Sequence, residues 1–289
     1  MIAPAVLQTL KYSNHFDHPL TLEEIHSRLC SSDPCSLERV IGTLRSMLDQ
    51  HQIQKTGDYY HLPGHKSLVA RRLKRAKLST PQLTRARVLA NQLGKVPGVL
   101  AIYLTGSLAM KNSDANSDID FMIITQSGRL WTTRLFLTLY TSLLGLRRTP
   151  GSTHNSGKVC LNLYLTQRSY LIPTEKQSLY TAYELIQAVP LYDPHNTQSD
   201  LLFANSWIQD FLPNVPIPER TLLPMGRLFD RRRGRMPSRD TEGGRSLPVG
   251  SIESLSYHLQ LWYMRSKLTR EYVTPDSAFF HPHNPAPKV

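Results

Sequence analysis

The sequence predicts an α+β protein in which helices flank a mixed sheet. Two apolar runs, residues 99–104 and 121–124, have the length of buried strands. Other segments repeat apolar residues at helical spacing, both in the first 65 residues and after residue 130. A chain of 289 residues with 40% hydrophobic residues is long enough for two domains with packed cores.

Residues 1–65 are predicted to form a compact unit of three helices followed by a β-hairpin. Thr21 and Glu24 have the spacing of a capping box at the start of the second helix. Ser36 is placed to cap the third helix, whose apolar residues recur at helical spacing. Gly57 lies in a turn between two short strand-forming runs, which completes the hairpin.

This order of three helices and a hairpin is similar to a winged helix-turn-helix module. In such a module the third helix enters a DNA groove, so the resemblance makes DNA a candidate partner. The predicted third helix offers only Arg39 and Arg45 as basic residues, and Glu38 and Asp49 oppose them. The alternative is a unit that packs against the rest of the chain or binds another protein.

Residues 66–92 are predicted to be a basic helical linker between two domains. Pro81 is expected to divide this linker into two helices, because proline lacks the backbone donor that a helix interior needs. The charge has two interpretations, a solvated face or an electrostatic track for a nucleic-acid backbone or a triphosphate. No acidic residue interrupts the eight basic ones, which are Lys66, Arg71, Arg72, Lys74, Arg75, Lys77, Arg85 and Arg87.

Residues 93–212 are predicted to be the second and larger domain. After the second strand the sequence predicts a helix over 130–144, a third strand over 158–166, and two helices over 178–188 and 201–211.

The remaining residues are predicted to form a flexible segment and a final helix. Residues 213–250 are rich in Pro, Gly and Arg, which is typical of a flexible surface segment. Residues 251–289 are expected to contain a helix over 252–272 and an extended tail from Pro275. The packing face expected for that helix consists of Leu255, Leu259, Trp262 and Tyr263, with Leu268 further on.

The two predicted strands carry a polar motif at the point where they meet. Gly106 and Ser107 end the first strand, and ten residues separate Ser107 from Asp118. Side chains alternate along a strand, so Asp118 and Asp120 share one face while Ile119 points into the core. Adjacent carboxylates repel each other, and a divalent cation such as Mg²⁺ relieves that repulsion. A surface turn followed by two solvated acids is the alternative interpretation.

This combination resembles the signature of the DNA polymerase beta-like nucleotidyltransferase superfamily. The resemblance implies a magnesium- or manganese-dependent enzyme that transfers a nucleoside monophosphate from a nucleoside triphosphate to an acceptor hydroxyl. It implies that Asp118 and Asp120 are catalytic metal ligands. Gly106 and Ser107 would bind the nucleotide, because glycine lets phosphate approach the backbone and a helix amino terminus attracts anions. The acceptor is not identified by the sequence.

The same family supplies a third carboxylate from a later strand, where this chain has Asn162. Asn162 is therefore the third catalytic candidate, although an amide carries no charge and cannot act as a base. Lys158 beside that strand is a candidate phosphate contact, and Asp193 is either a turn residue or a substitute acid.

The wider chain resembles uncharacterised predicted nucleotidyltransferases that begin with a winged helix. The alternative function is a non-catalytic regulator that binds nucleotide or DNA and retains the fold.

Charge and cysteine content restrict the class of protein and its partners. A net charge of +12 and an isoelectric point near 9.7 favour polyanionic partners. Three cysteines without paired zinc spacing indicate reduced thiols and a cytoplasmic location. No signal peptide is expected, and the apolar residues 130–146 are too few to span a bilayer, so no membrane association is predicted.

Overall fold

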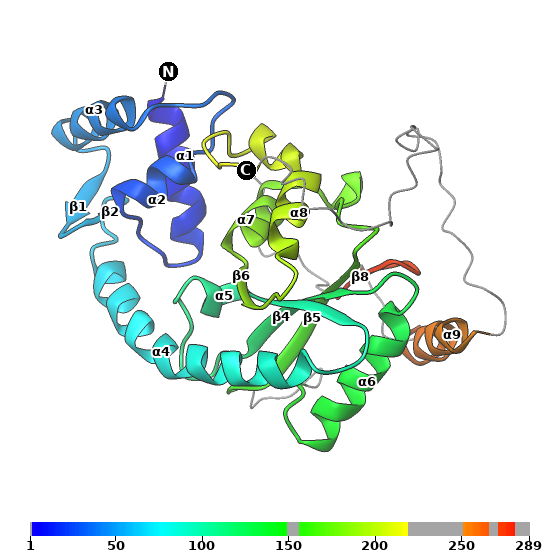
Figure 1. The fold of residues 1–289 in the computed structure, drawn as a ribbon. Coiled ribbons are helices and arrows are strands. Elements are labelled where there is room, and N and C mark those ends of the chain that lie inside the picture. Colours follow the sequence, from blue (N-terminus) through cyan, green and yellow to red (C-terminus); the bar gives the residue numbers. More distant parts are fainter. Residues whose placement is uncertain (1, 149–155, 219–250, 266–270, 281–289) are drawn as a thin grey trace, which may run out of the picture.

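A six-stranded mixed sheet with helices on both faces forms the centre of the protein (Figure 1). The computed structural model describes residues 2–148, 156–218, 251–265 and 271–280. The α+β architecture expected from the sequence is therefore confirmed. In spatial order the strands are β6 (Val189–Tyr192), β3 (Val99–Thr105), β4 (Ile119–Thr125), β5 (Val159–Thr166), β8 (Ser277–Phe279) and β7 (Tyr272–Val273).

The strands run in both directions because short turns and long crossovers both connect them. β3 is antiparallel to β4 and β6, β4 is parallel to β5, and β8 is antiparallel to β5 and β7. Along β3 the side chains alternate, so Ile102 and Leu104 enter one core while Ala101 and Tyr103 enter the other. Ile119 is fully buried, as its place between the two aspartates predicts.

Two helical layers cover the sheet. One face packs against α4 (Ser67–Leu93) and α6 (Leu130–Leu143), and α9 (Ile252–Met264) lies on α6. The other face packs against α7 (Leu179–Gln187) and α8 (Thr197–Ala204), with short 3₁₀ turns on either side. Across the described ranges, no helix combines the length and the hydrophobicity that a membrane span requires.

The amino-terminal unit has the three helices and the hairpin that the sequence predicts. They are α1 (Ala3–His15), α2 (Leu22–Ser27), α3 (Leu37–Asp49), β1 (Gln54–Thr56) and β2 (Tyr59–His61). The predicted capping box is present, since Thr21 Oγ1 accepts from the Glu24 amide and Glu24 Oε2 accepts from the Thr21 amide. Ser36 Oγ likewise accepts from the Arg39 amide at the start of α3. Local sequence signals therefore define these helices.

The amino-terminal unit packs directly against the layer of residues that covers the sheet. The Tyr12 ring of α1 stacks on Tyr183 of α7 at a centroid distance of 4.4 Å. Asn214 accepts from the Cys35 amide and donates to the His26 carbonyl, both at 2.7 Å. Tyr12 consequently belongs to the same apolar core as the sheet residues.

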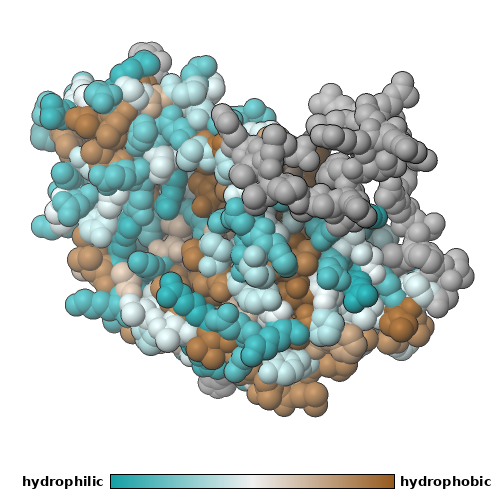
Figure 2. All heavy atoms as spheres, viewed as in Figure 1, coloured by the Kyte–Doolittle hydropathy of each residue, from teal (hydrophilic) through white to brown (hydrophobic). Residues whose placement is uncertain are grey.

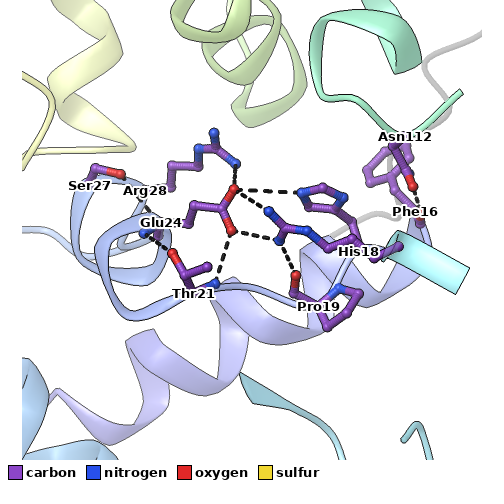
Figure 3. A network of polar contacts seen from close by, with 9 residues as sticks. Phe16, His18, Pro19, Thr21, Glu24, Ser27, Arg28 and Asn112 are labelled. Carbon is purple, nitrogen blue, oxygen red and sulfur yellow. Dashed lines mark hydrogen bonds and ion pairs between the residues drawn. The ribbon is translucent and has the colours of Figure 1, made fainter. Parts of the chain in front are cut away.

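A buried polar network centred on Glu24 adds to this docking (Figure 3). Arg72 of α4 binds both carboxylate oxygens of Glu24, at 2.7 and 2.8 Å. Arg28 and His18 approach the same carboxylate, each at 3.8 Å. At the edge of the network Asn112 donates to the Phe16 carbonyl at 2.8 Å, which links the amino-terminal unit to the turn between β3 and β4.

The linker is one continuous helix, so the expected break at Pro81 is wrong. α4 extends through Pro81 from Ser67 to Leu93. An internal proline costs about 3 kcal/mol or more, but both ends of this helix are anchored. Leu68 and Val69 are buried near its start, and residues 86–93 pack against the sheet. Tertiary packing therefore holds together a helix that local propensity would divide.

The last helix and two strands differ from the prediction. The last helix ends at Met264, and Tyr272 already lies in β7, so the predicted helix over 252–272 is too long. The expected extended tail from Pro275 instead enters the sheet as β8, which pairs with β5. Strand β6 was also not predicted, because four residues that include a proline give a weak strand signal. The flexible segment predicted over 213–250 lies outside the described residues from 219 onward.

The packing face predicted for α9 is wrong. Its large apolar side chains are exposed, and Figure 2 shows hydrophobic surface over α6 and α9. The buried face is mostly polar because it supplies hydrogen bonds to α6: Glu253 accepts from the Trp131 and Thr132 amides, and Gln260 donates to the Trp131 carbonyl. The exposed side chains are Ile252, Leu255, Leu259, Trp262 and Tyr263.

Candidate functional site

The candidate site lies where β3 ends and β4 begins. These strands are antiparallel, and their register places Thr105 opposite Asp120. Gly106 follows directly with a φ of +66°, a conformation that other residues rarely adopt. A Cβ atom at Gly106 would collide with the Asp120 carboxylate. The structure thus brings together the glycine and the second aspartate of the motif.

Strand β5 contributes two further side chains through a β-bulge. Asp120 pairs with Cys160 and Phe121 pairs with Leu161, but Met122 then pairs with Leu163. Asn162 is therefore the extra residue of β5, and such bulges redirect side chains. Its side chain amide donates to Asp120 Oδ1, and its Oδ1 accepts from Cys160 Sγ at 2.5 Å.

Three potential metal ligands converge at this place. Oxygen atoms of Asp118 and Asp120 and the sulfur of Cys160 all lie within 4.8 Å of one another. Within the described ranges this is the one group of three such residues. Asn162 is nearly inaccessible, with 3% of its surface exposed, and both of its amide atoms are engaged by Asp120 and Cys160. The two carboxylates and the thiol are therefore the candidate ligands, and Asn162 hydrogen-bonds to two of them, Asp120 and Cys160.

The grouping of acids shifts their protonation equilibria. Burial and the negative charge of Asp118 raise the pKa of the Asp120 carboxyl to about 7, although the hydrogen bond from Asn162 opposes that rise. Burial and the charges of Asp120 and Asp118 raise the pKa of the Cys160 thiol to about 12. A cation bound here would favour the charged forms and lower both pKa values.

Arg148 compensates part of that charge. Its Nη1 donates to Asp118 Oδ2 at 2.6 Å and lies 4.0 Å from Cys160 Sγ. The preceding residue, Arg147, forms a bridge with Val159 at the start of β5, which places Arg148 beside the site. The guanidinium occupies the position of a counter-ion for Asp118.

The structure also places the two remaining residues that were predicted to bind nucleotide, Ser107 and Lys158. Ser107 is the second residue of the short helix α5 (Gly106–Ala109) and is exposed. Lys158 Nζ donates to the Gly145 carbonyl beyond the end of α6.

Asp193 forms part of a different structure. Its carboxylate accepts from the Thr197 and Gln198 amides at 2.8 and 3.1 Å, and so caps α8. The simpler interpretation of Asp193, as a turn residue, agrees with this placement.

The sequence analysis did not identify Cys160 and Arg148 as site residues. Cys160 shares a strand face with Asn162, so strand periodicity would have indicated it once the parallel pairing with β4 was known. Arg148 carries no sequence signal, because its place depends on a bridge to β5. The charge of Asp120 also acts on Tyr180 of α7, whose pKa is raised mainly by burial and by Glu184.

No protein-family model matches the chain, and no curated protein matches it. The geometry of the site and the sequence motif therefore carry the functional argument.

Proposed function

We propose that the protein is a metal-dependent nucleotidyltransferase that transfers a nucleoside monophosphate from a nucleoside triphosphate to an acceptor hydroxyl. The observation that carries the proposal is the pair Asp118 and Asp120 at the head of β4, directly beside the Gly106 turn that ends β3. A mixed sheet supports both, and the motif resembles that of the DNA polymerase beta-like superfamily. The protein would then be a polymerase beta-like domain with an amino-terminal winged-helix module.

Each site residue has a role in this proposal. Asp118 and Asp120 bind Mg²⁺ or Mn²⁺, which neutralises phosphate charge and activates the acceptor hydroxyl. Gly106 brings its backbone close to the Asp120 carboxylate and so to a metal-bound phosphate, and the exposed Ser107 hydroxyl donates a hydrogen bond to that phosphate. Asn162 positions Asp120 through its amide hydrogen bond.

Two cations compete for the role of phosphate contact. The Lys158 ammonium already donates to the Gly145 carbonyl, which weakens its case. Arg148 is closer to the aspartates, and its side chain is 43% exposed. A metal ion at Asp118 would replace the guanidinium as counter-ion and free Arg148 to bind phosphate.

The test is transfer of radioactive α-phosphate by the full-length protein. The protein is incubated with labelled nucleoside triphosphates, Mg²⁺ or Mn²⁺, and cell extract as the source of acceptors. We expect label in protein, RNA or a small product with the parent and with Asp58→Asn, a control on the exposed hairpin turn. Asp120→Asn should reduce the label to background. Equal labelling by Asp120→Asn, or none with the parent, contradicts the proposal.

A second candidate function is a nucleotide- or DNA-binding regulator without catalytic activity. Asn162 favours it, because a neutral amide stands where the superfamily has a carboxylate. Asn162→Asp decides between the two: a slow enzyme should gain activity with Mg²⁺ when the charge is restored. If parent and variant both bind nucleotide and neither transfers label with either metal, the regulator is the better account.

A further inference from the structure

We propose that Cys160 is the third protein ligand of the metal site, and that its sulfur directs the site toward zinc-like ions rather than Mg²⁺. This inference rests on the metal site of the proposed function; it adds a third ligand and replaces the Mg²⁺ or Mn²⁺ named there with a zinc-like ion. Asp118, Asp120 and Cys160 present two oxygens and one sulfur within 4.8 Å of one another.

The register of the sheet is the first support. Cys160 is the direct cross-strand partner of Asp120, whereas Asn162 lies in the bulge and has no partner on β4. Neighbouring strands are about 4.8 Å apart, so directly paired side chains on one face can share an ion. Asn162 instead holds both ligands, with its amide nitrogen on Asp120 and its oxygen on the Cys160 thiol.

This pattern is typical of a positioning residue behind two metal ligands. One amide that touches the carboxylate and the thiol sets their relative orientation before an ion arrives. The partner of the Asp118 oxygen, the Arg148 guanidinium, also lies 4.0 Å from Cys160 Sγ. A positive charge is thus already accommodated between Asp118 and Cys160.

The ligand chemistry then determines the preferred ion. Thiolate is a soft ligand that suits Zn²⁺, while Mg²⁺ prefers oxygen ligands alone. Two carboxylates and one thiolate fill three positions of a tetrahedral Zn²⁺ site and leave the fourth for substrate. On binding, the metal–sulfur bond forms and the thiol proton passes to water.

Cobalt binding tests the inference directly, because Co²⁺ substitutes for Zn²⁺ and a bound sulfur gives a charge-transfer band in the near ultraviolet. Full-length protein is titrated with Co²⁺ and then with Zn²⁺ as competitor. We expect the band in the parent and its displacement by Zn²⁺. Cys160→Ser should lose the band and bind Co²⁺ at least about tenfold more weakly. Cys35→Ser, which removes a different thiol in the amino-terminal unit, should retain the band.

The results that overturn the inference are a parent without the band, or a band that survives in Cys160→Ser. Failure of the proposed function gives a different result. If the band depends on Cys160 but no nucleotide binds or reacts, the metal site stands and the nucleotidyltransferase does not. If label transfer depends on Asp120 while no sulfur band appears, the enzyme stands and Cys160 is only a packed thiol.

Discussion

Asp118 and Asp120 are stabilised by different neighbours. Arg148 gives Asp118 a charged partner at 2.6 Å, while Asp120 receives a neutral amide from Asn162. A third carboxylate at position 162 would add like charge beside a carboxyl whose pKa is already raised to about 7. Asn162 therefore lets the protein hold two acids together when no ion is bound.

Gly106 is the residue whose replacement most directly tests this packing. We expect Gly106→Ala to destabilise the protein strongly, because it combines positive-φ strain of about 1–2 kcal/mol with a collision between the new Cβ and Asp120. Gly128 is a matched control, since its φ is +73° and a Cβ there meets nothing within 4 Å. Gly128→Ala should show the strain alone.

Chemical denaturation of both variants measures the difference in the free energy of unfolding. Metal or nucleotide binding should be lost in Gly106→Ala even at temperatures where it stays folded. Equal destabilisation of the two variants would show that the close approach of Gly106 to Asp120 has no energetic consequence.

Among the elements, α2 and α4 are joined through Glu24. Burial would raise the pKa of this carboxyl, but contacts with His18, Arg72 and the Thr21 amide outweigh burial and hold it well below its ordinary range. Burial also lowers the pKa of His18, so this imidazole is neutral in the folded protein. Both shifts make the unfolded chain bind more protons than the folded one.

Stability should therefore fall as the pH falls, in two stages. The His18 contribution is lost below its ordinary pKa of about 6.5, and the Glu24 contribution below about 4.3. Glu24→Gln should cost about 1–3 kcal/mol near neutral pH, because the half-buried Arg72 loses its charged partner. Urea denaturation across the acid range measures this, and the deficit should close at low pH. A deficit independent of pH contradicts the assignment.

Helices α6 and α9 are joined by a cap that comes from another helix. The Glu253 carboxylate of α9 accepts from the Trp131 and Thr132 amides and from Thr132 Oγ1, at 2.7 to 2.9 Å. Helix amino termini lack internal acceptors, so this carboxylate satisfies the first turn of α6 and complements its dipole.

We expect Glu253→Ala to destabilise the protein by about 1–3 kcal/mol, because buried backbone donors lose their acceptor. Leu255→Ala on the same helix should change stability little, since 70% of that side chain is already exposed. Thermal unfolding of the two variants distinguishes them. A larger effect from Leu255→Ala would indicate that the exposed face of α9 is covered in the folded protein.

On the scale of the whole molecule, the basic side chains of the linker fall into two groups, those paired with acids and those exposed. Arg71 and Arg75 approach Asp17 at 2.6 and 3.6 Å, and Arg72 binds Glu24. These three arginines hold the amino-terminal unit on α4. The other five basic side chains of the linker are exposed: Lys66, Lys74, Lys77, Arg85 and Arg87.

If those exposed cations contact a nucleic-acid backbone, the affinity of the protein for nucleic acid should fall steeply as the salt concentration rises. Lys74→Glu should weaken binding at low salt and reduce the slope of log affinity against log salt by about one. Lys95→Glu, an equal charge change at an exposed position beyond the linker, is the control. Fluorescence anisotropy with single- and double-stranded probes measures both. No binding at low salt, or equal effects of the two variants, would show that the linker cations are solvated and do not bind nucleic acid.

Local chemistry determined what the sequence could predict. The amino-terminal helices, the capping box at Thr21, strands β3 and β4 and helix α6 all follow from spacing and caps within a few residues. The burial of Ile119 between Asp118 and Asp120 follows from the period of a strand. The sequence therefore specified the α+β class and the polar motif by itself.

Contacts between distant segments decided the rest. Pro81 stays within one helix because both ends of α4 are packed, and α9 buries Glu253 because α6 needs an acceptor there. Cys160 meets Asp120 because β5 pairs in parallel with β4, and the bulge at Asn162 shifts that register by one residue. Strand register depends on partners that are remote in the chain, so no local pattern could have assigned Cys160 to the site.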